Sequence, residues 1–269
     1  MSTSMAHVYV LTGATGELGH VIARELAQGG DTAGEKRHLV LVGRSRRTLE
    51  TLSAQVVNSH TRTYIVADNE LVEVGPATEA IMAEFERVVQ ETGAQRLTLV
   101  HCAGSLGDLS KSVRDFTPEE IAHYVAVNYT SFAALTARFL GFAPSTADRV
   151  AVVNISSLLA VAAYPNWGLY SSIKAARDQL LKVAALEYRD DARVKMLSYA
   201  PGPLNNAMQD EVRRTIGDPE QRGIYARLHA DRQLVEPETT AALLCSLLDR
   251  WTFQSGEHID IYDLISPPS

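Results

Sequence analysis

Short apolar runs rich in β-branched residues alternate along the chain with longer segments whose apolar residues recur at helical spacing. The runs predict strands, because such side chains pack well on a buried pleated surface. We expect strands at 7–12, 38–43, 62–67, 96–101, 150–156, 193–199 and 258–262. The intervening segments predict helices near 17–28, 46–57, 77–92, 118–141, 169–188 and 237–250.

This alternation is typical of βαβ units, in which a helix connects two parallel strands. No repeat, low-complexity tract or Pro/Gly/Ser-rich linker divides the chain. We therefore expect one domain over residues 1–269, with a Rossmann-type, doubly wound parallel sheet of seven strands and helices on both faces. Right-handed crossovers would bring the carboxyl ends of the strands to one edge, where a ligand crevice usually lies.

The stretch 201–237 departs from this rhythm, because it is long and follows the end of a predicted strand. It contains two short helical patterns, at 205–215 and 219–228. Long insertions near a ligand crevice often close over the substrate, so we expect a mobile lid here. An ordinary surface excursion is the alternative.

Composition excludes several classes of protein. The chain has 269 residues, of which 46% are hydrophobic and 21% charged, and no apolar run approaches the ~18 residues that span a bilayer. The first residues lack a basic leader and a long apolar stretch, so we expect a cytoplasmic protein with no secretory signal. A net charge of −7 argues against nucleic-acid binding, which requires clustered positive charge.

The chain contains two cysteines, Cys102 and Cys245, far apart in sequence. They match no metal-ligand spacing and are too few for a disulfide framework. We expect both to be reduced, packed thiols and predict no metal site.

A glycine-rich turn, TGATGELG at 12–19, joins the first predicted strand to the first predicted helix. Gly13, Gly16 and Gly19 allow positive φ and close backbone approach, and a helix N-terminus offers free amides to a pyrophosphate. The turn therefore predicts a dinucleotide site. Alone it is only moderately specific, because glycines are common in tight turns.

The end of the second predicted strand indicates which dinucleotide binds. An acid there typically holds the ribose hydroxyls of NAD, whereas an arginine accommodates the 2′-phosphate of NADP. Gly43 is followed by Arg44, whose planar guanidinium can grip a phosphate, so we expect NADP(H). Asp68 and Asn69, beyond the third strand, are placed to bond the adenine, although turn formation explains them nearly as well.

The segment YSSIK places Tyr170 four residues before Lys174, and Ser157 lies thirteen residues upstream in NISS. Residues four apart share one face of a helix, so the ammonium can lie near the phenol. A nearby cation lowers a tyrosine pKa from about 10 toward neutrality, which suits a general acid. An isolated pattern of this kind is more often an ordinary amphipathic helix.

Hydride transfer to a ketone leaves negative charge on oxygen, which needs a hydrogen-bond donor and a proton at the same atom. Ser157 and Tyr170 can supply both. Asn128, within a long helical pattern, reads from the residues alone more readily as a buried amide paired with backbone.

Motifs that occur in one family's order are present along the chain, namely TGxxGxxG, HCAG at 101–104, Asn128, NISS, YSSIK and the PG of 201–202. Through them the chain resembles the short-chain dehydrogenase/reductase family throughout its length. Within that family it is most similar to the sepiapterin reductases, through AGSLGDLSK at 103–111, LYSSIKAARD, YAPGPL at 199–204 and SGEHIDIYD. The resemblance implies an NADP-dependent oxidoreductase acting on CH–OH and C=O groups, and reduction of pterin side-chain ketones in tetrahydrobiopterin biosynthesis.

The resemblance also implies individual roles. Ser157 orients the carbonyl, Tyr170 protonates it, Lys174 holds the nicotinamide ribose and lowers the tyrosine pKa, and Asn128 supports a proton relay. The implied cofactor-contacting residues are Gly13, Thr15, Gly16, Glu17, Leu18, Gly19, Arg44, Ser45, Asp68, Asn69, Ala103, Gly104, Tyr170, Lys174, Pro201, Leu204 and Asn206.

The implied substrate site combines one carboxylate with an apolar wall. Asp260 would bind the guanidine-like edge of the pterin, since a carboxylate accepts two parallel N–H bonds; an exposed acid at a strand end is an equal alternative. The substrate-contacting residues are Ser157, Leu158, Tyr164, Trp167, Tyr170, Gly202, Met208 and Asp260. The aromatic and methionine side chains could equally be ordinary core.

Several positions depart from the family pattern. His101 and Cys102 replace the usual pair of asparagines, and we interpret His101 as structural. Glu17 stands where sepiapterin reductases carry glycine, and Gly16 replaces a basic residue near the 2′-phosphate, which leaves more of the NADP preference to Arg44. Asn206 replaces a threonine, but its amide can still bond the nicotinamide carboxamide.

Two other functions stay open. The same machinery could reduce diketones, quinones or other carbonyl compounds in a roomy apolar pocket. A non-catalytic NADP-binding regulator is a third possibility, although such proteins tend to lose the tyrosine or lysine that this chain retains.

The family commonly pairs two long helices of each subunit, so we expect a homodimer through the faces of 120–140 and 170–187.

Overall fold

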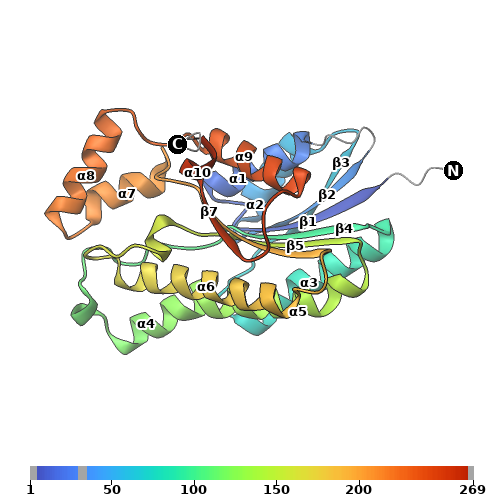
Figure 1. The fold of residues 1–269 in the computed structure, drawn as a ribbon, viewed down its shortest axis with the longest axis horizontal. Coiled ribbons are helices and arrows are strands. Elements are labelled where there is room, and N and C mark those ends of the chain that lie inside the picture. Colours follow the sequence, from blue (N-terminus) through green and yellow to red (C-terminus); the bar gives the residue numbers. More distant parts are fainter. Residues whose placement is uncertain (1–4, 30–34, 266–269) are drawn as a thin grey trace.

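The computed structural model describes residues 5–29 and 35–265. Within them, seven parallel strands form one sheet in the order β3-β2-β1-β4-β5-β6-β7 (Figure 1). The strands are β1 (Ala6–Thr12), β2 (Lys36–Val42), β3 (Thr61–Val66), β4 (Arg96–His101), β5 (Arg149–Ile155), β6 (Val194–Ala200) and β7 (Glu257–Asp260). Each predicted strand is confirmed, with bounds that shift by at most two residues.

The α-helices alternate with the strands in chain order. They are α1 (Glu17–Gln28), α2 (Arg46–Val56), α3 (Val74–Thr92), α4 (Pro118–Val125), α5 (Ser131–Phe142), α6 (Gly168–Glu187), α7 (Ala207–Thr215), α8 (Pro219–Ala230), α9 (Pro237–Arg250) and α10 (Ile261–Ile265). Across residues 5–29 and 35–265, none of the helices combines the length and apolarity that crossing a membrane requires.

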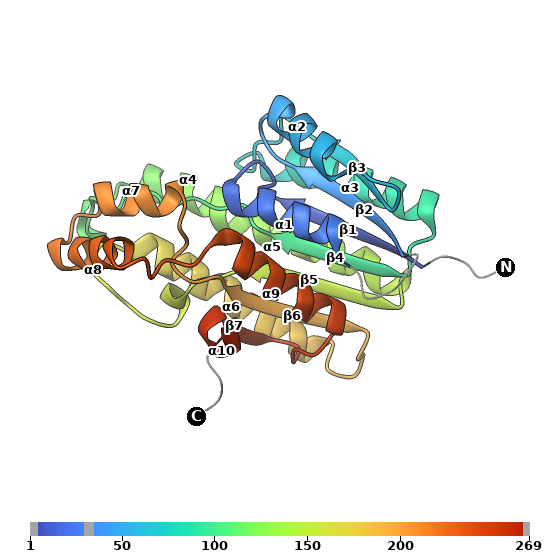
Figure 2. The ribbon, with the colours of Figure 1, turned by 90° about the horizontal axis from the view of Figure 1, so that it is seen from above.

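The helices cover both faces of the sheet, as expected (Figures 1 and 2). One core cluster packs α3, α5 and α6 against one face, with Phe85 and Phe139 fully buried at its centre. A second cluster packs α1, α2 and α9 against the other face around Leu41 and Leu49. Burial on both faces explains why the strands are continuous apolar runs instead of alternating ones.

The strand order reverses between β1 and β4, which are adjacent although β2 and β3 lie between them in sequence. Loops on either side of such a reversal diverge and leave a crevice at the carboxyl ends of the strands. The glycine-rich turn follows β1, and the segment Ala103–Gly104 follows β4. The expected ligand edge is therefore formed.

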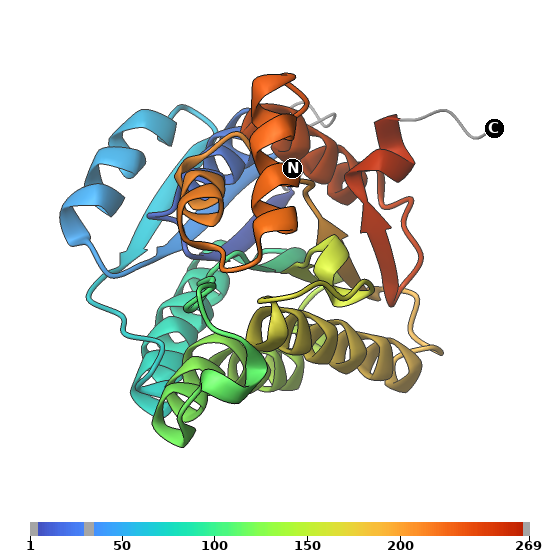
Figure 3. The same ribbon diagram turned by 90° about the vertical axis from the view of Figure 1, so that its left-hand side faces the viewer.

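The segment 201–237 folds into α7 and α8, which project beyond the carboxyl edge of the sheet (Figure 1) and lie in front of the strands when seen from that side (Figure 3). A short parallel bridge between Leu204 and Val235 closes its base. Val212 of α7 and Ile216, which follows α7, join a third apolar cluster with Leu109, Leu159 and Trp167. The two predicted helical patterns are confirmed.

The predicted helix 118–141 is interrupted. A π-helical turn, Ala126–Thr130, separates α4 from α5, and Asn128 lies at its middle. A π turn inserts one extra residue into a helix and often marks a functional site. The apolar spacing of 118–141 predicts one continuous helix and does not indicate this turn.

Candidate active site

The glycine-rich turn brings backbone segments into contact that side chains would keep apart. Gly13 has φ +71°, and a Cβ there would lie 2.7 Å from the amide nitrogen of Ala103. A Cβ at Gly19 would collide with the carbonyl oxygen of Gly13. Gly16 is the N-cap of α1 and has no side chain to bond the first amides, so the amides of the first turn are open to a phosphate. The turn therefore fits a dinucleotide pyrophosphate.

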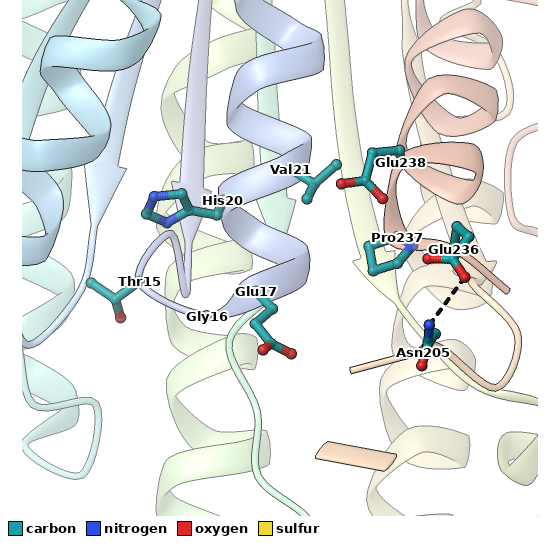
Figure 4. A pocket seen from close by; sticks show the side chains of 9 residues that line it. All are labelled: Thr15, Gly16, Glu17, His20, Val21, Asn205, Glu236, Pro237 and Glu238. Atoms are coloured by element: carbon teal, nitrogen blue, oxygen red, sulfur yellow. Dashed lines mark hydrogen bonds between the residues drawn. The ribbon is translucent and has the colours of Figure 1, made fainter. Parts of the chain in front are cut away.

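A cleft of about 410 Å³ lies beside this turn (Figure 4). Thr15, Gly16, Glu17, His20 and Val21 form one wall, and Asn205, Glu236, Pro237 and Glu238 form the other. Asn205 donates to Glu236 across 3.0 Å. Because three carboxylates line this cleft, the backbone amides of the turn are the better place for a phosphate.

Glu17 connects the glycine-rich turn to the projecting helices. Its Oε2 accepts a 2.8 Å hydrogen bond from the backbone amide of Ala207, the first residue of α7. Asn206 caps the same helix, because its Oδ1 accepts from the amide of Gln209 at 3.0 Å. The side chains of Glu17 and Asn206 thus both serve the start of α7, and their expected contacts with a cofactor stay predictions.

The remaining cofactor positions lie around the strand ends. Thr15 and Leu18 flank the glycines, Ser45 caps α2 by accepting from the Thr48 amide at 3.3 Å, and Pro201 is buried just after β6. Gly202 has φ +80°, where a Cβ would lie 2.9 Å from side-chain atoms of Ile261 and Val235.

The adenosine end is partly as expected. Arg44 is exposed at the end of β2, free to meet a phosphate. Asp68 has φ +55° and forms an exposed ion pair of 3.2 Å with Arg46. Asn69 is buried and its Nδ2 donates to the carbonyl of Ala77 at 3.1 Å, so its side chain faces α3. A contact of Asn69 with adenine would come from its backbone.

The phenol and ammonium share one face of α6, as their spacing predicts. Lys174 Nζ lies 5.4 Å from the centre of the Tyr170 ring and donates to the backbone carbonyl of Ile155 at 2.6 Å. That bond anchors the lysine to the end of β5, two residues before Ser157. Ser157, Tyr170 and Lys174, the residues expected to donate and transfer a proton, therefore lie together at the end of β5.

The pKa of Tyr170 moves in the direction opposite to the sequence expectation. Burial raises the pKa of the phenol, and Ser157 and the Arg177 charge offset that effect only in part. Burial also favours the neutral form of Lys174 and, together with repulsion from Arg177, lowers its pKa to about 7. The packing of this region, which the sequence does not reveal, sets both directions.

Ser157, and not Ser156, offers its hydroxyl to the site. Ser156 is 2% exposed, whereas Ser157 is partly exposed. Ser157 starts the 3₁₀ turn Leu158–Ala160, and its Oγ accepts from the amide of Leu159 at 3.2 Å. Because its oxygen accepts that bond, its proton remains available for a carbonyl oxygen.

The side chain of Asn128 is fully engaged. Its Oδ1 accepts from the amide of Ser105 at 2.8 Å, and its Nδ2 donates to the carbonyl of Tyr124 at 3.0 Å and to Ser105 Oγ at 3.2 Å. Asn128 thereby ties the π turn to the loop after β4. The amide pairing with backbone that we weighed from sequence is present, and a relay role stays a prediction.

Arg177 is a site residue that the sequence interpretation missed. It lies three residues after Lys174 on α6, is 2% exposed, and donates to the backbone carbonyls of Asn128 and Ala103. A signal was present: positions 170, 174 and 177 follow i, i+4 and i+7 spacing and so share one helical face.

The expected substrate wall divides into exposed and buried members. Leu158, Tyr164 and Met208 are 52%, 42% and 42% exposed, which suits contact with a ligand. Trp167 is only 3% exposed and packs edge-on against Tyr170 at 5.3 Å between ring centres. Trp167 therefore supports Tyr170 and belongs to the core beneath α7.

Asp260 ends β7 directly beside Ala200 of β6, the residue before the PG turn. It is partly exposed, and its Oδ1 accepts from the amide of Tyr262 at 3.0 Å. One carboxylate oxygen is thus oriented by the backbone. The position at the carboxyl edge agrees with a substrate contact.

His101 and the cysteines have structural roles. His101 is buried, pairs with Thr136 across 3.0 Å and packs on Phe132, and burial lowers its pKa well below the ordinary value. Cys102 and Cys245 are free thiols, as predicted. Burial raises the pKa of Cys102 to about 11, which keeps it protonated near neutrality.

Comparison with known proteins identifies the wider group. The family profile described as short chain dehydrogenase matches residues 7–217. Sepiapterin reductase of Meriones unguiculatus is 40% identical over 262 residues, which cover 95% of this chain and 96% of that protein. Benzil reductase ((S)-benzoin forming) of Bacillus subtilis (strain 168) is 26% identical over 263 residues, covering 96% and 99%.

Solved structures agree with the fold. The angucycline C-6 ketoreductase LanV, crystallised with bound NADP, superposes with a TM-score of 0.75 at 24% identity. The match covers 96% of each chain. At this identity the likeness concerns the fold alone.

Proposed function

Because the chain belongs to the short-chain dehydrogenase family and is an oxidoreductase that uses a nicotinamide cofactor, we propose that it reduces the side-chain ketones of pterins with NADPH. The observation that carries the pterin assignment is the 40% identity to a sepiapterin reductase, which extends over nearly the full length of both chains. The position of Asp260 at the carboxyl edge supports it.

The chemistry rests on the residues at the end of β5 and the start of α6. The bound cofactor would supply a hydride to the carbonyl carbon, so that the carbonyl electron pair moves to oxygen. Tyr170 gives that oxygen its phenolic proton, and Ser157 donates a second hydrogen bond to it. The raised pKa of Tyr170 keeps its proton in place until the oxygen becomes basic.

Lys174 and Asn128 complete the set. Lys174 lies on the same face of α6 as Tyr170, where its ammonium can bond a ribose hydroxyl and assist return of a proton to the phenol. Asn128 holds the loop that follows β4 through two bonds to Ser105, which fixes the neighbouring Ala103 and Gly104. We propose Ser157, Tyr170, Lys174 and Asn128 as the catalytic group.

NADP(H) is the cofactor that the residues favour. Arg44 is exposed at the end of β2, and its guanidinium can bind a 2′-phosphate in a bidentate manner. No acid takes the place beside it that NAD-specific proteins use for the ribose. The glycine-rich turn would hold the pyrophosphate through backbone amides.

Substrate binding would involve the projecting helices. We propose that α7 and α8 act as the lid, because they are joined to the rest of the chain through a short bridge and a small apolar cluster. Met208 of α7 and Leu158 and Tyr164 after Ser157 offer exposed apolar surface to a flat ring. Asp260 would accept two N–H bonds from the pterin edge.

Diketone reduction is the alternative with its own support, since benzil is a diketone and a benzil reductase matches this chain along its length. An apolar wall alone would suit such a substrate, whereas a pterin also needs the carboxylate of Asp260. Asp260→Ala should therefore reduce pterin turnover far more than benzil turnover, and equal losses would favour the diketone.

The test is reduction of sepiapterin with NADPH and with NADH by the purified protein, with Tyr170→Phe as control. We expect rapid turnover with NADPH that the control abolishes. Turnover of benzil but not sepiapterin would move the assignment to diketones. Tight NADPH binding without hydride transfer to either compound would make the protein a cofactor-binding regulator.

A homodimer also remains a proposal. Ile121 of α4 and Val183 and Leu186 of α6 are 38%, 41% and 64% exposed. Burial of such side chains between two subunits would remove apolar surface from water. Sedimentation equilibrium of the purified protein tests this, and a monomer would refute it. The cytoplasmic location stays a prediction.

A further inference from the structure

Arg177 is a buried cation without a carboxylate partner. The residue is 2% exposed, and the ion pairs of 4 Å or less among residues 5–29 and 35–265 do not include it. A buried charge is costly unless hydrogen bonds compensate it. Such a residue in the middle of a catalytic helix therefore needs a reason.

The compensation comes from two backbone carbonyls on different elements. Arg177 Nε donates to the carbonyl of Asn128 at 2.5 Å, and both terminal nitrogens donate to the carbonyl of Ala103 at 3.3 Å. The guanidinium carbon lies 4.8 Å from the centre of the Phe132 ring. One side chain of α6 thus holds the π turn and the loop after β4.

These two segments are the ones that the proposed reaction must place accurately. Ala103 packs against Gly13 of the glycine-rich turn, and its amide donates to Thr12 Oγ1 at 3.3 Å. Asn128 holds the amide of Ser105. Arg177 therefore connects the side of the cofactor crevice to the helix that carries Tyr170 and Lys174.

The charge of Arg177 acts on the same groups. Repulsion from it lowers the pKa of Lys174 further, and attraction to phenolate opposes the effect of burial on the pKa of Tyr170. The other titratable groups that face this region are Tyr124 of α4, His101 and Cys102 at the end of β4, and Asp178 of α6. Burial lowers the pKa of Arg177 to about 10, so the guanidinium still carries its positive charge near neutrality.

We propose that Arg177 is a positioning residue of the reduction, which locks the loop after β4 and the π turn onto α6 and holds a fixed positive charge behind Lys174 and Tyr170. This inference rests on the proposed function. It predicts that geometry and charge can be separated by substitution, because lysine keeps the charge but loses the fork that bonds two carbonyls.

The experiment compares Arg177→Met and Arg177→Lys with Arg37→Met and Arg37→Lys. Arg37 is the control for loss of a buried guanidinium, since it donates to the backbone carbonyl of Leu26 at 2.7 Å but lies at the opposite edge of the sheet. Unlike Arg177, it also pairs with Glu35 and Asp249, so its variants should lower Tm at least as much. For each protein we would measure kcat and KM for sepiapterin and benzil over a range of pH, NADPH affinity by fluorescence, and Tm.

Arg177→Met should lower kcat by about 10- to 100-fold with a smaller change in KM, because small misplacements near reacting groups have large effects. The pH above which its rate falls should be about one unit higher than in the wild type, because removing the Arg177 cation raises the pKa of both Lys174 and Tyr170. Arg177→Lys should keep the wild-type pH profile and recover part of kcat. The Arg37 variants should change Tm alone.

The proposal is overturned if Arg177→Met behaves like Arg37→Met, with unchanged kcat and pH profile. If Arg177→Met does not fold, Arg177→Lys is compared with Arg37→Lys, and an equal kcat in these two variants overturns the proposal. If the wild type reduces neither compound, the proposed function fails, and the NADPH affinity still tests the inference. Weaker NADPH binding by Arg177→Met than by Arg37→Met would then support it, and equal binding would refute it.

Discussion

Asp178→Ala should destabilise the protein strongly, because Asp178 joins three elements in the core beside the catalytic helix. The residue is 4% exposed, its Oδ2 lies 2.7 Å from Nδ1 of His258 on β7, and its Oδ1 accepts from Asn154 of β5 at 2.9 Å. Alanine would leave the buried amide of Asn154 and the partly exposed ring of His258 without this partner. A fully buried donor without a partner costs about 1–3 kcal/mol, and His258 is partly exposed and costs less, so we expect a combined loss of about 2–4 kcal/mol.

Thermal unfolding followed by circular dichroism is the assay. For a chain of this size the loss corresponds to a fall in Tm of about 5–12 °C. Asp190→Ala is the control, because that side chain is 92% exposed and its nearest cation, Arg189, lies 3.7 Å away. Its Tm should match the wild type, since such surface pairs add little. Equal Tm values for the two variants would refute the reasoning.

The effect should also depend on pH. Burial alone would raise the pKa of Asp178, but the hydrogen-bonding groups around the carboxylate, His258 foremost, together outweigh burial and lower the pKa. A carboxyl with a lowered folded pKa adds stability above its unfolded value near ~3.9, and this stability is lost as the pH falls through the folded value. The Tm of Asp178→Ala should therefore lie below that of the wild type by its largest amount at neutral pH, and the two Tm values should approach each other below about pH 4.

Three further predictions concern cofactor binding and the pH dependence of the reduction. Gly19→Ala should abolish NADPH binding measured by fluorescence, because its Cβ would collide with the Gly13 carbonyl and open the turn; wild-type affinity would contradict the proposed pyrophosphate site. Arg44→Ala should raise the Kd of NADPH about 10- to 100-fold and leave NADH unchanged, since a charged hydrogen bond contributes about 1.5–3 kcal/mol; the exposed Arg47→Ala is the control, and an unchanged preference would assign the phosphate to another group. Because burial lowers the pKa of Lys174 to about 7, the ammonium is lost as pH rises through that value, so kcat/KM for reduction should fall above about pH 7 in a stopped-flow profile; a flat profile to pH 9 or so would exclude this titration.

Some features of the site are local and were predictable from sequence. Strand positions follow from apolar runs that need burial on both faces, and the glycine-rich turn follows from spacing that only a close backbone approach explains. Tyr170 and Lys174 share a face because a helix repeats every 3.6 residues. The carboxyl edge of the sheet follows from parallel topology, so the meeting of Gly13, Ser157 and Asp260 at that edge could also be predicted.

Other features depend on contacts between distant segments, which no local pattern encodes. Glu17 bonds to Ala207, 190 residues away, and Arg177 bonds to Asn128 and Ala103. The π turn adds one residue to a helix whose apolar spacing looks continuous. The pKa of Tyr170 is raised because packing removes water from the phenol. Sequence alone thus determined which residues could do chemistry and on which edge they lie, whereas tertiary packing decided their hydrogen bonds and charge states, since both depend on which distant groups exclude water from them.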